Sequence, residues 1–150
     1  MLEKKTKIMK SLVIDATSDK IFLVIINSKN IYTSTHENSK SNFDKLTIFI
    51  NDFLKKNEIS INKIDQIYVN RGPGSFAGIR NSLSIVKGIH ISRNIDYFCF
   101  SYFDFLDEKP RNIKYFLQKN MIKPPKWIDI PNLCNKYKIR KNLIKPLYIS

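Results

Sequence analysis

The chain has 150 residues, enough for one domain with its own hydrophobic core and too few for two full domains. It carries 26 Lys and Arg residues against 13 Asp and Glu, a net charge of +13 that raises nucleic acid as a possible partner. Lysine and asparagine are abundant and arginine is rare, so we attribute much of this charge to background composition. Cys99 and Cys134 lack the C-x-x-C spacing of a zinc or redox site, which indicates reduced thiols.

No apolar run approaches the roughly 18 to 20 residues that cross a bilayer. The basic residues at the N-terminus are followed only by Leu12–Ile14 before Asp15 interrupts the apolar run, so a signal peptide is not indicated. We expect a soluble, cytoplasmic protein without a membrane partner.

The first half of the chain predicts three strands and a helix. Apolar runs predict strands at residues 12–14, 21–26 and 31–35, and the short connections between them predict an antiparallel meander. A helix is expected over residues 43–54, where Phe43, Leu46, Ile50, Phe53 and Leu54 recur on one stripe. Ser41 and Asp44 have the spacing of a capping box at its start.

The second half continues with a strand at residues 64–69, a glycine-rich turn, and a helix that runs to about residue 92. A fifth strand at 97–100 and a helical turn to residue 106 follow. Helices that connect strands as crossovers require the later strands to lie parallel to their neighbours. The order βββαβαβ predicts an α/β, ribonuclease H-like half-domain with a mixed sheet, as in the actin, Hsp70 and sugar kinase superfamily.

The glycine turn has two interpretations. Gly72, Gly74 and Gly78 can adopt positive φ or permit close backbone approach, and the following helix N-terminus suits an anion. The spacing G-x-G-x-x-x-G is one residue longer than a dinucleotide fingerprint and lacks the G-K-[ST] of a P-loop. We therefore favour a packing turn over a nucleotide site, with Ser75 as the helix N-cap and no cofactor.

Catalytic groups are hard to assemble from this sequence. Asp15 ends the first strand, where ribonuclease H-like nucleases hold metal, yet the fourth strand ends in Asn70 and Arg71 instead of a second carboxylate. His36 and His90 form no H-x-x-x-H pair, so no metal site is predicted. Ser75 lacks a G-x-S-x-G elbow. We expect Asp15 to cap a turn, and we expect no catalytic residue.

The segment GPGSFAGIR, followed by Leu83, Lys87 and Gly88, resembles the glycine motif of the TsaB (YeaZ-like) proteins of tRNA threonylcarbamoyladenosine biosynthesis. The opening SLVIDAT and the closing KPLYIS resemble the ends of the same family, which implies the ribonuclease H-like fold again. The residues placed in the motif are Gly72, Pro73, Gly74, Ser75, Phe76, Gly78 and Arg80.

The resemblance implies a non-catalytic subunit that binds a TsaD-type enzyme in forming N6-threonylcarbamoyladenosine at position 37 of tRNA. Further implied partners are a TsaE-type ATPase and, through the complex, tRNA, and a homodimer is possible. The two helices would carry the interface, and small residues of the second helix would permit close approach. The interface residues are Phe43, Leu46, Ile50, Ser82, Ile85 and Ile89.

Residues 1–107 form the predicted ribonuclease H-like domain, and residues 108–150 form a short, basic, proline-interrupted segment in place of the family's second domain. From Lys109 to Lys145 this segment has eleven basic residues and one acid, Asp129. An alternative function is therefore a stand-alone RNA-binding module. Its RNA contacts would be Lys136, Lys138, Arg140 and Lys141.

Overall fold

A computed structural model describes residues 9–28, 30–119 and 122–149, apart from the side chain of Phe43. Five strands form one mixed sheet in the order β3-β2-β1-β4-β5. The strands are β1 (Lys10–Asp15), β2 (Lys20–Asn27), β3 (Asn30–Glu37), β4 (Gln66–Asn70) and β5 (Asp96–Phe100). β1, β2 and β3 pair antiparallel, whereas β4 pairs parallel to both β1 and β5. The predicted meander, the parallel pairing and the order βββαβαβ are confirmed.

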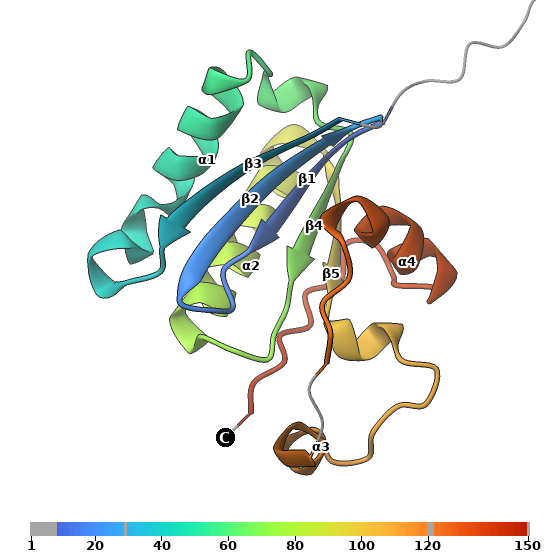
Figure 1. Cartoon of the computed structure of the whole chain (residues 1–150). Coiled ribbons are helices and arrows are strands. Elements are labelled where there is room, and N and C mark those ends of the chain that lie inside the picture. The colour runs from blue at the N-terminus through green and yellow to red at the C-terminus, as the bar shows by residue number, and fades with distance from the viewer. Residues whose placement is uncertain (1–8, 29, 120–121, 150) are drawn as a thin grey trace, which may run out of the picture.

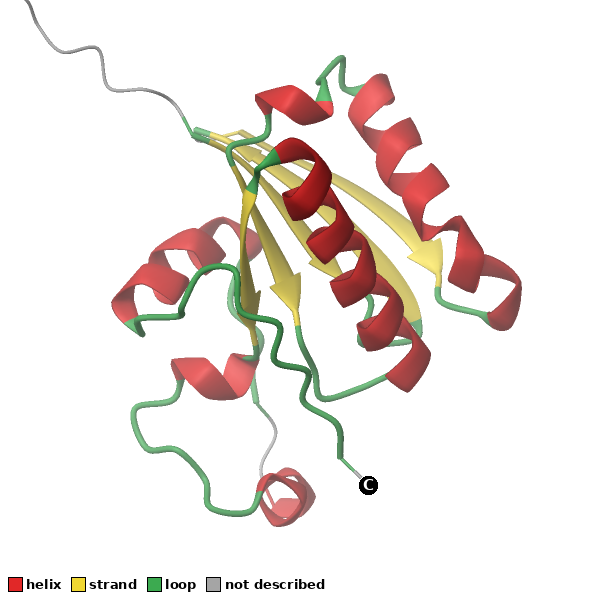
Figure 2. Ribbon diagram, turned by 180° about the vertical axis from the view of Figure 1, so that it is seen from behind, coloured by secondary structure: helices red, strands yellow, loops and turns green. Residues whose placement is uncertain are grey.

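Two long helices cover one face of the sheet (Figure 2). They are α1 (Leu46–Lys56) and α2 (Phe76–Arg93). The main core lies beneath them and joins Leu12 and Leu23 of the sheet to Ile50 of α1 and Val86 of α2. α2 ends at Asn94, whose φ of 57° is the left-handed conformation common after a helix.

The residues before α1 differ from the expectation. Lys40–Lys45 form a separate 3₁₀ helix, and α1 begins only at Leu46 without a side-chain cap. The predicted capping box is therefore wrong, because the Ser41 hydroxyl lies 2.9 Å from that of Ser39 and not on a helix N–H. β4 likewise begins at Gln66, two residues later than predicted, although Ile64 before it is buried.

The C-terminal segment covers part of the opposite face (Figure 1). α3 (Ile113–Lys119) has no buried residue, whereas α4 (Ile130–Lys136) buries Ile130 and Cys134 against Val13 and Phe100. Apolar side chains on both faces of β1 and β2 explain why these strands lack hydrophobic alternation, since each face has its own core.

The chain then returns along β5. Lys141 forms an antiparallel bridge with Phe98, the Asn142 N–H donates to the Tyr97 carbonyl (2.7 Å), and the Leu147 N–H donates to the Arg71 carbonyl (2.8 Å). These backbone bonds hold the last residues against the edge of the sheet. The predicted domain boundary at residue 107 stays a prediction. Among the described residues, no helix is long and apolar enough to span a membrane.

Candidate functional site

Polar side chains gather where β1, β4 and β5 end, at what we call the carboxyl edge of the sheet. Asp15 is the last residue of β1 and Asn70 the last of β4, and both are buried. β1 and β4 are parallel neighbours, so their carboxyl ends meet at one edge. Ligands of open α/β sheets commonly bind at such an edge, which makes it the first candidate site.

Asp15 is fully engaged by its own chain. Its Oδ1 accepts from the Thr17 N–H (3.0 Å) and the Thr17 hydroxyl (2.6 Å). Its Oδ2 accepts from Asn70 Nδ2 (3.0 Å) and the Tyr102 hydroxyl (3.2 Å). Burial, and then the Asp15 charge, raise the pKa of Tyr102, which therefore stays a donor at neutral pH. A carboxylate has about four acceptor positions, so this network occupies Asp15. The predicted turn-capping role is confirmed.

The glycine turn packs against other backbone. Gly72 and Gly74 have φ of 117° and 156°. A Cβ on Gly72 would lie 2.2 Å from the Leu147 carbonyl oxygen, and one on Gly74 would lie 2.1 Å from that of Thr17. Gly78 lies inside α2 and packs equally close to backbone, since a Cβ on Gly78 would lie 1.9 Å from the Ala16 carbonyl oxygen. Glycine is therefore required by close approach at all three positions.

Four N–H groups of this turn and of the first turn of α2 donate within the chain. Gly72 donates to Asn70 Oδ1 (3.0 Å) and Ser75 to the Thr17 carbonyl (2.7 Å). Gly78 donates to Ser75 Oγ (3.1 Å), which confirms Ser75 as the N-cap of α2. Ile79 donates to the Ser75 carbonyl. Donors that are already bonded do not cradle a phosphate, so the geometry favours the packing turn over a nucleotide site.

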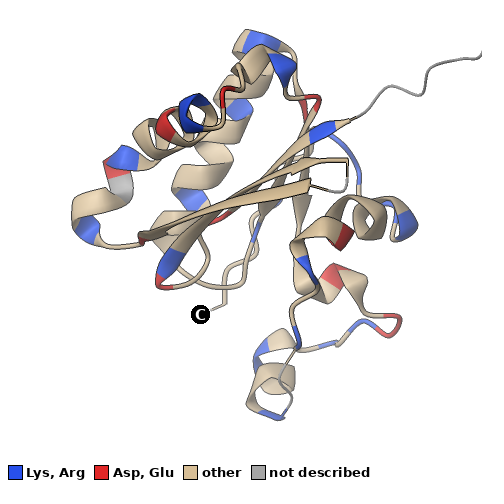
Figure 3. Ribbon diagram, turned by 45° about the horizontal axis from the view of Figure 1, so that its top comes forward, with Lys and Arg blue, Asp and Glu red and all other residues tan. Residues whose placement is uncertain are grey.

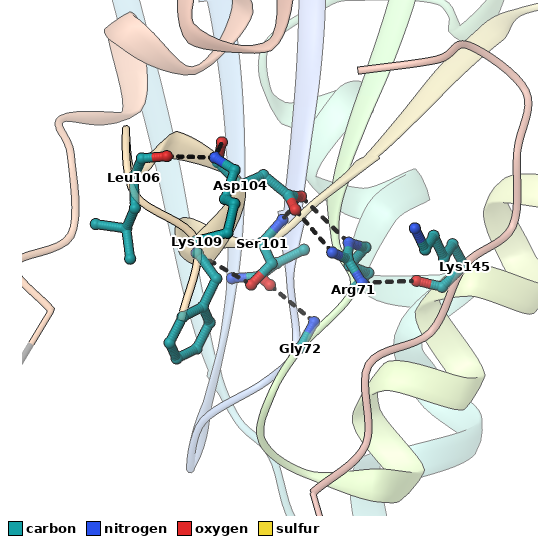
Figure 4. A network of polar contacts seen from close by, with 9 residues as sticks. Arg71, Gly72, Ser101, Asp104, Leu106, Lys109 and Lys145 are labelled. Carbon is teal, nitrogen blue, oxygen red and sulfur yellow. Dashed lines mark hydrogen bonds and ion pairs between the residues drawn. The ribbon is translucent and has the colours of Figure 1, made fainter. Parts of the chain in front are cut away.

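Arg71 and Asp104 form a partly buried ion pair beside the turn (Figure 4), which the sequence pattern did not predict. Arg71 Nη2 lies 2.7 Å from Asp104 Oδ1, Nε donates to Oδ2, and Nη1 donates to the Lys145 carbonyl (3.3 Å). Asp104 also completes a capping box with Ser101 at the start of the 3₁₀ helix Tyr102–Phe105. The S-x-x-D spacing of residues 101–104 was the available sequence signal.

The remaining motif residues lie further out. Phe76 is 60% exposed and its ring lies 4.7 Å from that of Tyr148. Pro73 is half-buried, and Arg80 is exposed on α2. The hydrogen-bond partners of Asp15 in the described part of the chain are Thr17, Asn70 and Tyr102, and none of these three side chains is among them. The motif therefore divides into packing glycines and surface residues.

The predicted interface residues do not share one surface. Ile50, Ile85 and Ile89 line a groove of about 150 Å³ between α1 and α2, together with Ile61. Leu46 is buried in the core. The side chain of Phe43 is not among those that the structure describes, so the prediction for Phe43 stays a prediction.

Ser82 is fully buried, and its hydroxyl donates to the Ile79 carbonyl, so it is unavailable to a partner. The expectation that small residues permit close approach along one side of α2 is also wrong, because Gly78 and Ser82 are buried while Ser84 and Gly88 are exposed. Positions 78 and 82 lie on one face of the helix and positions 84 and 88 on another, since four residues span about one turn.

Lys and Arg residues are spread over several elements of the described chain (Figure 3). Of the four predicted RNA contacts, Lys136 lies over the Tyr137 ring (5.3 Å) and Lys141 pairs with Asp96 (3.7 Å). Lys138 and Arg140 are exposed. Within the described part of the chain, no three His, Cys, Asp or Glu residues could together hold a metal ion.

Both thiols are buried and are predicted to be unreactive in the folded protein. Burial raises the pKa of Cys99 to about 11 and that of Cys134 to about 12, so little thiolate forms at pH 8. Iodoacetamide at pH 8 should label neither cysteine in the native state and both in 6 M guanidinium, as measured by intact mass. Rapid native labelling of Cys134 would show that α4 leaves the sheet.

Comparison with known proteins identifies the family. The model of the TsaD family, described as tRNA N6-adenosine threonylcarbamoyltransferase, matches residues 29–109, more than half of the chain. The chain belongs to this family. The matched region includes β4, the glycine turn, α2 and β5, whereas β1 with Asp15 lies outside it.

Within the TsaD family the chain is TsaB-like. It is 37% identical to the tRNA threonylcarbamoyladenosine biosynthesis protein TsaB of Buchnera aphidicola subsp. Baizongia pistaciae, over 41% of this chain and 32% of that protein. The TsaB of Buchnera aphidicola subsp. Schizaphis graminum is 28% identical over 65% of this chain and 47% of that protein. The chain therefore spans at most about half the length of these curated relatives.

The solved structure of YeaZ from Pseudomonas aeruginosa matches with a TM-score of 0.59 at 16% identity. The match covers 74% of this chain and 49% of that protein. Together with the mixed sheet order, it confirms the predicted α/β, ribonuclease H-like fold.

Proposed function

We propose that this chain takes part in forming N6-threonylcarbamoyladenosine at position 37 of tRNA, as a non-catalytic subunit that binds a TsaD-type enzyme. Membership of the TsaD family and likeness to two TsaB proteins named for this biosynthesis support the pathway. The observation that carries the binding role is the apolar groove between α1 and α2.

The surface around this groove is suited to a protein partner. Ile85 and Ile89 of α2 are half-buried beside Ile50 of α1, and no other layer of the described chain covers them. Ile48 of α1 is 54% exposed and Ile91 of α2 is 73% exposed. An apolar groove between two helices that no further layer covers is typical of an interaction surface.

The carboxyl edge supports a role without catalysis. The oxygens of Asp15 accept four hydrogen bonds from Thr17, Asn70 and Tyr102. Those bonds leave the carboxylate no acceptor position for a metal ion or a substrate proton. A TsaE-type ATPase, tRNA held through the complex, and a homodimer are further partners within this proposal.

The test is co-expression with the TsaD-type protein of the same organism and size-exclusion chromatography of the pair. We expect co-elution of wild type, and at least a tenfold loss of affinity for Ile85→Glu with Ile89→Glu, because two charges would be buried in an apolar contact. Ser82 is unsuitable as a test position, since a larger side chain there would disrupt the core.

The matched control carries the same chemistry outside α1 and α2, namely Ile31→Glu with Ile128→Glu. These isoleucines are 40% and 36% exposed, on β3 and on the 3₁₀ helix Trp127–Asp129. The control should bind like wild type, and circular dichroism should show both variants folded. Wild type that elutes alone, or equal loss in both variants, would contradict the proposed interface.

A further inference from the structure

Two adjacent hollows lie near α4, and the first of them is on the face of the sheet opposite α1 and α2. The first, of about 490 Å³, is lined by Tyr68 and Phe98 from the sheet and by Asn132, Asn135 and Lys138 from α4 and its end. The Tyr68 and Phe98 rings stack on neighbouring strands with centroids 5.1 Å apart. An aromatic floor beside side-chain amides suits a planar ligand with polar edges, such as a nucleobase.

The second hollow, of about 210 Å³, shares Lys138 and Ile139 with the first. Its other lining residues include Arg140 and Lys145, and also the Arg71–Asp104 pair, whose charges compensate each other. A ligand in the first hollow that extends past Lys138 therefore reaches Arg140 and Lys145.

The net charge of this surface is positive. No acidic residue lines the first hollow, and Asp104 in the second is paired with Arg71. Lys138, Arg140 and Lys145 form no ion pair with any acid in the described ranges. Burial raises the pKa of Tyr68, and that of Cys134 to about 12, so neither adds a negative charge at neutral pH.

We propose that these two hollows bind a nucleotide unit, with the base against Phe98 and the amides, and the phosphate between Lys138, Arg140 and Lys145. A nucleotide of single-stranded RNA and a free mononucleotide present the same chemistry, and the experiment distinguishes them. This site is separate from the α1 and α2 groove, so it does not depend on the proposed subunit role. The proposed site keeps Lys138 and Arg140 of the four predicted RNA contacts. It leaves out Lys136 and Lys141, because those side chains already have partners.

The first test is fluorescence anisotropy of a labelled single-stranded octaribonucleotide with the full chain, titrated over a series of salt concentrations. The variant is Lys138→Asn with Arg140→Gln and Lys145→Gln; asparagine suits position 138, where φ is 55°. We expect about tenfold weaker binding. The slope of log affinity against log salt should flatten by roughly 0.7, which is the contribution of one neutralised phosphate of a single strand.

The control triple is Lys55→Gln, Lys63→Gln and Lys87→Gln, three exposed lysines away from the hollows that lower the net charge equally. It should keep the affinity and the slope within about twofold. Phe98→Leu should weaken binding about tenfold, because a base could no longer stack on the ring. The matched control is Phe49→Leu, which changes a half-buried phenylalanine of α1 on the other side of the sheet and should leave binding unchanged. Thermal unfolding must show each variant folded.

The second arm uses AMP, and inorganic phosphate alone, by isothermal titration calorimetry. If RNA binding is lost in the site variants and AMP binds wild type far more weakly than RNA does, the ligand is the RNA strand. If AMP binds wild type about as tightly as RNA does and this binding is lost in the same variants, the ligand is the mononucleotide. Equal weakening by both triples, or no binding of either RNA or AMP to wild type, would overturn the site.

Discussion

Gly78→Ala is expected to lower the free energy of unfolding by about 3 kcal/mol, although alanine is the better helix former. The added Cβ would lie 1.9 Å from the Ala16 carbonyl oxygen and 2.8 Å from Asn38 Nδ2. Asn38 Nδ2 itself donates to that carbonyl (2.8 Å), so the methyl group would also separate a hydrogen-bonded pair. α2 and the end of β1 would have to move apart, which opens the carboxyl edge. Urea denaturation followed by circular dichroism measures the effect.

Gly88→Ala provides the control on the same helix. Apart from the adjacent residues and the surrounding backbone of α2 itself, no atom of the described chain lies within 4 Å of a Cβ built at Gly88, and the position is exposed. Alanine there should stabilise the protein by about 1 kcal/mol, the ordinary difference in helix propensity. If the two substitutions had the same sign, the close packing of α2 against Ala16 would be incorrect.

Arg71→Met is expected to cost roughly 2 to 3 kcal/mol of unfolding free energy, below the full loss for a deeply buried pair. The side chains of Arg71 and Asp104 are 11% and 20% exposed, so solvent screens their charges in part. Removing the guanidinium leaves Asp104 with the Ser101 N–H (2.8 Å), and it also releases the Lys145 carbonyl. The C-terminal segment should therefore be cleaved faster by trypsin in this variant than in wild type.

A double-mutant cycle separates the ion pair from the other contacts. Asp104→Asn keeps an oxygen that can accept from the Ser101 N–H, so it removes mainly the charge. If the pair stabilises the fold as described, Arg71→Met with Asp104→Asn should cost at least 1 kcal/mol less than the two single substitutions added together. Strict additivity would show that the two charges do not interact.

Local sequence patterns were sufficient for the five strands, for α1 and α2, and for the order of these elements. Apolar runs fixed the strands, and spaced apolar residues placed α1 and α2 within a few residues. The roles of Gly72, Gly74, Gly78 and Ser75 were also readable, because only glycine accepts such φ values or approaches, and serine before a helix caps its first turn. The family motif covers the same residues, so the family resemblance rests mainly on this segment, whereas the fold was predicted from the order of the elements.

The sequence alone could not pair residues far apart in the chain. Arg71 meets Asp104 and Lys145, and Asp15 meets Asn70 and Tyr102, only because β1, β4 and β5 end at one edge of the sheet. The burial of Ser82 and the hollows beside α4 depend on which face each element turns toward the sheet. Propensity and spacing act over a few residues and determine the elements. Contacts between distant residues depend on packing of the whole chain, so only the tertiary structure decided them.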